Sequence, residues 1–343
     1  MPEDLEPIRP APRTSAGRPK RSLPAIVGAI TLGIIALACF ASAPWALGWT
    51  SSSGAAPPYR NAELDAYFLP PVWVGHDAGE QARRDAEAAL HEPGSAPMHV
   101  LGTDNLGRDL LTRCLLGGSI SLGVGFSAAL ISVIVGTLYG AIAGAAGGRV
   151  DAVMMRIVDV LYGLPYILLV VLLAVGADAV IDRLAGGALS SGSRIALNVL
   201  TLLIAIGGVS WLTMARVIRG QVLSLKAQPF MEAARAIGAP IHRQFFRHLL
   251  PNMIGPIVVY ATLTVPQAIL QESFLSFLGI GIQPPLPSWG NLAAAGLSEL
   301  NTVNPRWWLL LFPSLLLGVT LLALNFVGEG LREALDPRSG RST

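Results

Sequence analysis

The chain has 343 residues, of which 52% are hydrophobic and only 13% are charged. Soluble domains carry about a quarter charged residues, so this composition argues against a soluble enzyme or binding domain and predicts an integral membrane protein. The formal net charge of +2 gives no support to nucleic acid as a partner.

Six apolar stretches are long enough to cross a bilayer, because a helix rises about 1.5 Å per residue and needs roughly 20 apolar residues to span the hydrocarbon core. They are Leu23–Leu47, Ile120–Ala143, Val158–Val175, Ile195–Met214, Ile254–Phe277 and Trp307–Val327. The first is too long for the apolar region of a signal peptide, so we interpret it as a retained helix. The sequence predicts an all-α membrane protein with six transmembrane helices.

These helices divide the chain into four parts. We expect a cytoplasmic tail at 1–22, the first membrane helix at 23–47, an outer (periplasmic) loop at 48–119, and a core at 120–343 that includes a cytoplasmic segment at 216–251. Most of the 24 Lys and Arg residues fall on one side if both termini are cytoplasmic, as expected from the excess of positive charge in cytoplasmic loops.

The first outer loop is long and acidic, and its charged, Ala-spaced stretch Glu80–Leu90 predicts a surface helix. His76, His91 and His99 share this loop, but their spacing matches no known metal motif. We expect solvated histidines there and no metal site.

The second membrane helix carries small residues at every fourth position, an arrangement that lets another helix approach closely. They are Gly136, Gly140, Gly144 and Gly148. We interpret this stripe as packing within the chain, with dimerisation as the alternative.

The fifth membrane helix combines two prolines, Pro256 and Pro266, with polar residues in its outer half. Gln267, Gln271 and Glu272 are candidates for lining a translocation path, since ionisable residues in a membrane usually face a cavity or a partner helix. The alternative for Glu272 is a hydrogen bond to a neighbouring loop at the outer interface.

The cytoplasmic segment 216–251 has the most specific pattern. It predicts a helix at Pro229–Ile237, a break at Gly238–Ala239–Pro240 and a second helix to Leu250. One side of this unit is apolar and the other basic. Such a compact unit fits a groove on a cytoplasmic partner, or alternatively lies on the anionic inner leaflet.

This segment resembles the EAA loop of bacterial ABC importer permeases. The residues that carry the resemblance are Glu232, Ala233, Ala234, Gly238, Leu250 and Pro251. The general motif has Ile where this chain has His248, and the peptide and nickel branch of the family is more similar at that point. The resemblance implies that the first helix docks into a cleft on an ATPase subunit.

Further stretches are similar to the C-type permease subunit of dipeptide and oligopeptide importers, in the same order along the chain. They are residues 101–109, 272–279, 287–291, 330–332 and 336–338. The first and second outer loops look longer than is usual for that family. Both face the side where a binding protein would dock, which leaves the cargo open among dipeptides, longer peptides, glutathione, nickel and other metal chelates.

The resemblance implies a multi-pass permease of the type I ABC importer fold in the bacterial inner membrane. Its partners would be a second homologous permease, two ATPase subunits, an extracytoplasmic peptide-binding protein and membrane lipid. Neither Lys20 nor Lys226 lies in a Gly-Lys-Ser/Thr phosphate-binding loop. We therefore expect no catalysis and no cofactor in this subunit, with ATP and Mg held by the ATPases.

Two functions of other classes remain as rivals. A self-contained secondary transporter would show internal repeats and several intramembrane charges, and only Glu272 is a candidate charge here. An intramembrane enzyme would need a catalytic constellation within the helices, and the six stretches contain none that we recognise.

Overall fold

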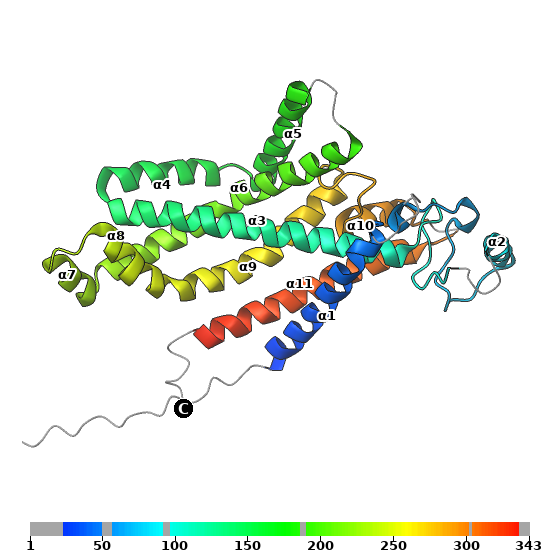
Figure 1. The fold of residues 1–343 in the computed structure, drawn as a ribbon, viewed down its shortest axis with the longest axis horizontal. Helices are drawn as coiled ribbons and strands as arrows, with labels where there is room; N and C mark the ends of the chain where they lie inside the picture. The colour runs from blue at the N-terminus through cyan, green and yellow to red at the C-terminus, as the bar shows by residue number, and fades with distance from the viewer. Residues whose placement is uncertain (1–22, 50–56, 92–96, 186–189, 302–303, 336–343) are drawn as a thin grey trace, which may run out of the picture.

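The computed structural model describes residues 23–49, 57–91, 97–185, 190–301 and 304–335 (Figure 1). These parts of the chain are mainly helical. The helices are α1 (Leu23–Ala46), α2 (Ala78–Ala89), α3 (Leu110–Ala146), α4 (Gly148–Tyr162), α5 (Tyr166–Ala185), α6 (Ser191–Lys226), α7 (Pro229–Ala236), α8 (Ile241–Gln244), α9 (Leu250–Phe277), α10 (Trp289–Ser298) and α11 (Trp307–Leu335).

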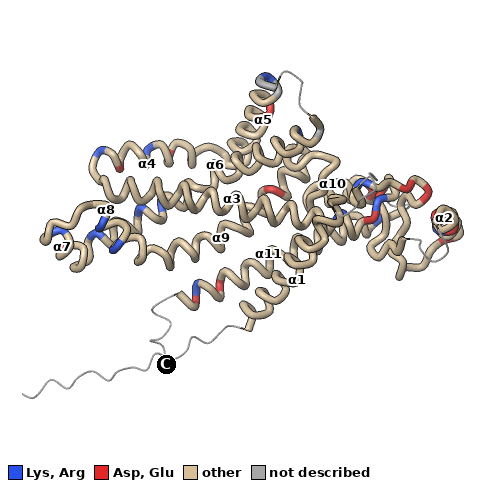
Figure 2. Tube along the Cα trace, viewed as in Figure 1, with Lys and Arg blue, Asp and Glu red and all other residues tan. Residues whose placement is uncertain are grey.

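The long helices form one bundle. In Figure 1, α3, α6 and α9 run side by side, and α1 pairs with α11 next to them. The start of α1 and the end of α11 are directed toward the end of the bundle that carries α7, which we call the inner end. The end that carries α2 is the outer end. Lys, Arg, Asp and Glu gather at these two ends and are almost absent from the middle (Figure 2), as expected for a bundle whose middle lies in hydrocarbon.

Among the described residues, five continuous helical stretches are long and apolar enough to cross a membrane, and a bent pair of helices provides a sixth if it counts as one span. The pair is α4 with α5, and the chain turns by 91° between them. The predicted third span, 158–175, crosses this bend. Pro165 has no backbone N–H and disfavours helical backbone at the preceding residue, so α4 ends at Tyr162 and α5 begins only at Tyr166.

Close packing of α3 against α6 depends on glycine. A Cβ on Gly136 would lie 2.5 Å from the Cβ of Met214, and one on Gly140 would lie 2.3 Å from the carbonyl oxygen of Ala215. At Gly144 it would lie 2.8 Å from Val222. The stripe therefore packs against α6 of the same chain, which supports the within-chain interpretation.

Gly148 does not belong to this packing face. Nothing lies within 4 Å of a Cβ built on it, and its φ of +57° follows the φ of +65° at Gly147. Two consecutive left-handed residues form the turn from α3 to α4, and glycine adopts that conformation without steric cost.

The outer loop is tied to the start of α3 by a buried histidine. His99 Nε2 lies 2.7 Å from Glu87 Oε1 on α2, and His99 Nδ1 lies 3.1 Å from Asp109 Oδ1, the N-cap residue of α3. His99 is only 8% exposed, so the prediction of solvated loop histidines is wrong at this position. No group of three or more His, Cys, Asp or Glu side chains in the described residues could hold a metal ion.

The surface helix begins slightly earlier than the sequence predicts, at Ala78. Asp77 and Glu80 form a capping box, in which each side chain accepts a hydrogen bond from the backbone of the other. These bonds satisfy two backbone N–H groups that the helix start would otherwise leave unpaired.

A first prediction concerns the α3–α6 contact. Gly140→Ala should lower the stability of the detergent-solubilised protein by roughly 1–3 kcal/mol, because the new methyl group forces the two helices apart. The matched control is Gly123→Ala on the same helix, where a Cβ would meet nothing within 4 Å. The melting temperatures are measured by thermal unfolding. An equal decrease for Gly140→Ala and Gly123→Ala would contradict the assignment of Gly140 to the α3–α6 contact.

A second prediction concerns pH. Burial alone lowers the pKa of His99, but hydrogen bonds to Asp109 and Glu87 and the charges of both outweigh it and raise that pKa from 6.5 to about 9. The stabilisation is complete below the unfolded pKa of about 6.5 and is lost as the pH rises through the folded pKa. Hydrogen-exchange protection of α2 should therefore fall between pH 7 and pH 10.

His99→Gln should remove that pH dependence and leave α2 poorly protected already at pH 7. His76→Gln is the control, since the His76 ring contacts Arg84 instead. Unchanged protection of α2 in His99→Gln would show that the histidine does not hold this loop.

Candidate functional site

The segment that joins α6 to α9 protrudes from the inner end of the bundle (Figure 1). We call residues 227–249 the connecting segment. It consists of α7, a turn, α8 and a π-helical stretch, Phe245–Leu249, that runs directly into α9.

The turn after α7 requires glycine. Gly238 has a φ of +72°, a left-handed conformation that costs other residues roughly 1–2 kcal/mol. Pro240 then precedes α8, and Gln244 Nε2 donates to the carbonyl oxygen of Ala239 at 2.7 Å. The break predicted at 238–240 thus lies at a defined reversal of the chain.

The second predicted helix does not stop at Leu250. It continues into α9, so that residues 241–277 form one candidate span. The Leu250 N–H donates to the Phe245 carbonyl, five residues back. Such a widened turn occurs where Pro251 removes a backbone donor and crowds the preceding turn. The Leu-Pro pair therefore marks the junction between the connecting segment and the membrane helix.

One face of α7 packs against the chain's own helices. Met231 and Ala234 are 1% and 4% exposed, and Met231 lies in a cluster with Met214, Ile218 and Val222 of α6. Ala234, one of the motif residues, is thus buried within this chain. Glu232, Ala233 and Gly238 are exposed, and His248 is half-buried.

Polar contacts join the connecting segment to the ends of α3 and α6. Lys226 Nζ donates to the carbonyl oxygens of Gly144 (3.0 Å) and Ala145 (2.9 Å), the last turn of α3. Arg235 in turn donates to the Lys226 carbonyl. A cation at this position also complements the negative end of the helix dipole. These bonds link α7 to the ends of two long helices, α3 and α6.

Two arginines of α6 hold α4. Arg219 forms a two-pronged ion pair with Asp151 (2.5 and 2.6 Å), and Arg216 bonds Asp159 at 2.9 Å while it stacks on the Tyr162 ring at 4.0 Å. Their acidic partners are 57 and 68 residues away in the sequence.

The connecting segment also carries large apolar side chains that are exposed in the described chain. Its large exposed side chains are Phe230 (39%), Ile237 (83%), Ile241 (78%) and Phe246 (65%). Exposed apolar groups gathered on a rigid protrusion are typical of a surface that binds another protein.

A cavity of about 450 Å³ lies between α5, α6 and α9. Its polar lining is uncharged and consists of hydroxyl and amide groups, from Tyr162, Tyr166, Ser210, Thr213, Tyr260, Thr264, Gln267 and Gln271. Both predicted glutamines line it. Tyr166 and Ser210 were not predicted, because single hydroxyl residues in an apolar run carry no distinctive pattern.

Glu272 does not line this cavity. Its side chain is completely buried, and Ser276 and Ser273 donate to its carboxyl group at 2.7 and 3.3 Å. Ser121 of α3 and Ser288 at the start of α10 are further hydrogen-bond partners. The carboxyl group thus joins α3, α9 and the loop before α10, in agreement with the alternative interpretation of a hydrogen bond to a loop.

A third prediction separates these two roles of the α9 side chains. Glu272→Ala should destabilise the protein by roughly 3 kcal/mol, since it leaves buried hydroxyls without their acceptor and opens a void. Gln267→Ala, at an exposed position lining the cavity, should leave the melting temperature unchanged. Equal melting temperatures for Glu272→Ala and the wild type would refute the structural role.

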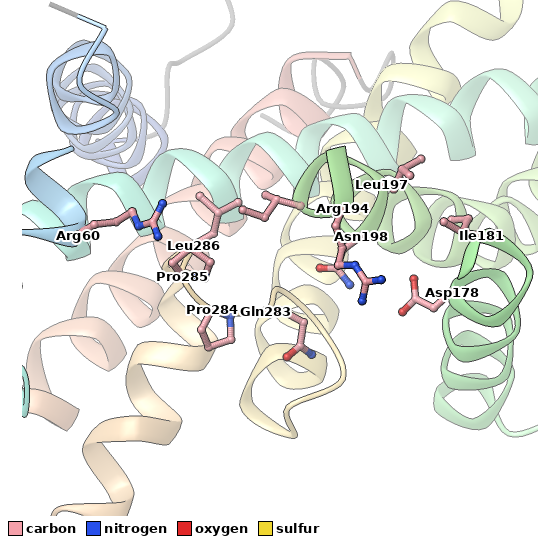
Figure 3. A pocket seen from close by; sticks show the side chains of 11 residues that line it. Arg60, Asp178, Ile181, Arg194, Leu197, Asn198, Gln283, Pro284, Pro285 and Leu286 are labelled. Carbon is pink, nitrogen blue, oxygen red and sulfur yellow. The ribbon is translucent and has the colours of Figure 1, made fainter. Parts of the chain in front are cut away.

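A second cavity of about 450 Å³ lies toward the outer end (Figure 3). Asp178 and Ile181 of α5 face Arg194 and Asn198 of α6 across it. Arg60 and the loop around Gln283 complete the lining. Unlike the first cavity, it is lined by charges of both signs.

Comparison with known proteins agrees with this geometry. A family model described as "Binding-protein-dependent transport system inner membrane component" matches residues 136–341. Escherichia coli (strain K12) oligopeptide transport system permease protein OppC is 49% identical over 240 residues, which cover 70% of this chain and 72% of that protein.

Two further relatives have similar coverage. Bacillus subtilis dipeptide transport system permease protein DppC is 46% identical over 243 residues, covering 71% of this chain and 70% of that protein. Haemophilus influenzae oligopeptide transport system permease protein OppC is 45% identical over 240 residues, or 70% of each chain. The chain therefore belongs to the binding-protein-dependent transport system inner membrane components, and is a multi-pass permease of the inner membrane.

Proposed function

We propose that this chain is one of two permease subunits of an ATP-driven importer for dipeptides or oligopeptides. The relatives named above are peptide permeases by description. A lining of neutral hydroxyl and amide groups suits that cargo, because these groups can bond the peptide backbone whatever side chains it carries. The observation that carries the proposal is this uncharged cavity in a bundle whose inner end carries a protrusion with exposed apolar side chains.

The connecting segment is the docking element for an ATPase subunit. Its exposed apolar side chains, Phe230, Ile237 and Ile241, would fill an apolar cleft, and the bonds of Lys226 and Arg235 would pass the movement of the cleft to α3 and α6. Glu232, Ala233 and Gly238 lie on the exposed part of this unit. Its association with a partner accounts for the exposed isoleucines better than contact with the inner leaflet, because α7 protrudes beyond the bundle end (Figure 1).

The assembly implied is two permeases, two ATPase subunits and an extracytoplasmic peptide-binding protein. The subunit itself would be non-catalytic and bind no cofactor, with ATP and Mg held by the ATPases. Both termini and the connecting segment would be cytoplasmic, which places the α2 loop on the side where the binding protein delivers cargo.

A fourth prediction tests docking. Ile237→Asp should abolish co-purification of the ATPase subunits from a detergent extract, because it places a charge in an apolar contact. The Ile237 side chain is 83% exposed, so the substitution should not affect folding. The second permease should still co-purify. Gly238→Asp should act in the same direction by altering the turn.

The control is Leu64→Asp, at a residue 70% exposed on the outer loop, which should retain every subunit. ATPases that remain bound to Ile237→Asp would rule out this surface as the docking site. If the wild type brings down no ATPase, a self-contained transporter becomes the better explanation.

A further inference from the structure

Three cavities follow one another along the bundle. The inner cavity, already described, is lined by residues 209–214 of α6 and 260–271 of α9. A middle cavity of about 250 Å³ is lined by residues 166–170 of α5 and 270–275 of α9. The outer cavity of Figure 3 is lined by residues 194–198 of α6 and by the loop at 283–286.

Their order follows from the helix directions. Helix α9 runs from the inner to the outer end and α6 runs the opposite way (Figure 1). The residue numbers of the α9 side chains that line the cavities therefore increase toward the outer end, and the residue numbers of the α6 side chains decrease. The series leads from charged walls at the outer cavity to neutral hydroxyls and amides at the inner one.

Two residues are shared between neighbouring cavities. Tyr166 and Gln271 line both the inner and the middle cavity, so their side chains form the partition between them. The Tyr166 hydroxyl donates to Gln271 Oε1 and lies 3.1 Å from Ser210 Oγ. One hydroxyl group thus joins α5, α6 and α9.

The remaining walls of the middle cavity are hydrocarbon. They come from Ile167, Val170, Leu270, Phe274 and Leu275. Ile167, Leu270 and Phe274 are 48%, 53% and 42% exposed, so this cavity is open along one side of the chain. Where the second permease of the proposed assembly closes that side, the apolar walls would exclude water and act as a barrier to polar solutes. A polar cargo can cross it only when the partition opens and the walls separate.

The position of Tyr166 suits a movable partition. It is the first residue of α5, directly after the 91° bend at 163–165. Movement at this bend carries the tyrosine toward or away from α9, and a neutral hydrogen bond breaks far more easily than a buried ion pair.

We propose that the Tyr166–Gln271 hydrogen bond is the gate between the inner and middle cavities, and that it opens when a short peptide passes. The inference rests on the proposed peptide permease function for its cargo. In the open state the Gln271 amide and the Tyr166 hydroxyl would be free to bond the peptide backbone in place of each other.

The test is the accessibility of a cysteine in the inner cavity. Thr264→Cys provides the reporter, and the native Cys39 and Cys114 are 1% and 0% exposed, which gives a low background. A membrane-impermeant maleimide is applied to vesicles of both orientations that contain the assembled complex. Labelling from the outer-loop side should rise about fivefold in Tyr166→Phe, the factor expected when one neutral hydrogen bond is lost.

Tyr166→Ala, which also removes the ring, should raise labelling further. Tyr139→Phe is the matched control, because the Tyr139 hydroxyl donates to the Met154 carbonyl at 2.8 Å and does not line any of the three cavities. Unchanged labelling in both Tyr166 variants, or an equal rise in the control, would overturn the gate.

Uptake of a labelled dipeptide by the wild-type complex separates this proposal from the function on which it rests. If labelling depends on Tyr166 but the complex takes up no dipeptide, the gate is supported and the proposed cargo is rejected. Dipeptide uptake together with labelling that is independent of Tyr166 would retain the cargo and reject the gate.

Discussion

The close approach of α3 and α6 is the contact on which the rest of the structure depends. Backbone can meet backbone there only because Gly136, Gly140 and Gly144 have no side chains. Lipid tails are as apolar as leucine, so helices in a membrane gain little from apolar burial and rely on such tight packing instead. Helix α4 is bound to this pair by the arginine–aspartate ion pairs. The start of the connecting segment is bound to it next to Lys226, which bonds the end of α3.

This arrangement explains how a small protrusion can act on a long bundle. Helix α7 buries Met231 against α6, while Lys226 and Arg235 bond backbone carbonyls at the helix ends. The connecting segment then passes without interruption into α9. A displacement of α7 therefore reaches α3, α6 and α9, the helices around the inner cavity or next to it, without any flexible linker between.

Fixed and movable polar groups occupy different faces of α9. Glu272 is buried among serines of three segments, an arrangement that satisfies its oxygens and holds the outer half of the bundle together. Gln267 and Gln271, five residues and one residue before it in the sequence, face the cavity with neutral groups. Their position allows the wall of the cavity to change without disturbing the packed side of the helix.

The sequence by itself determined the membrane class, the spans of continuous apolar residues, the family and the reversal at Gly238, because each depends on local composition or on a motif of fixed spacing. It also identified the glycine stripe and the polar face of α9.

Only the tertiary structure decided that the stripe meets α6, that Glu272 is enclosed by serines, that Ala234 faces inward, and that His99 is buried between two carboxylates. The position of Tyr166 in the wall between two cavities belongs to the same group. Each of these features depends on side chains far apart in the sequence, and a single sequence records which residues are present but not which of them meet.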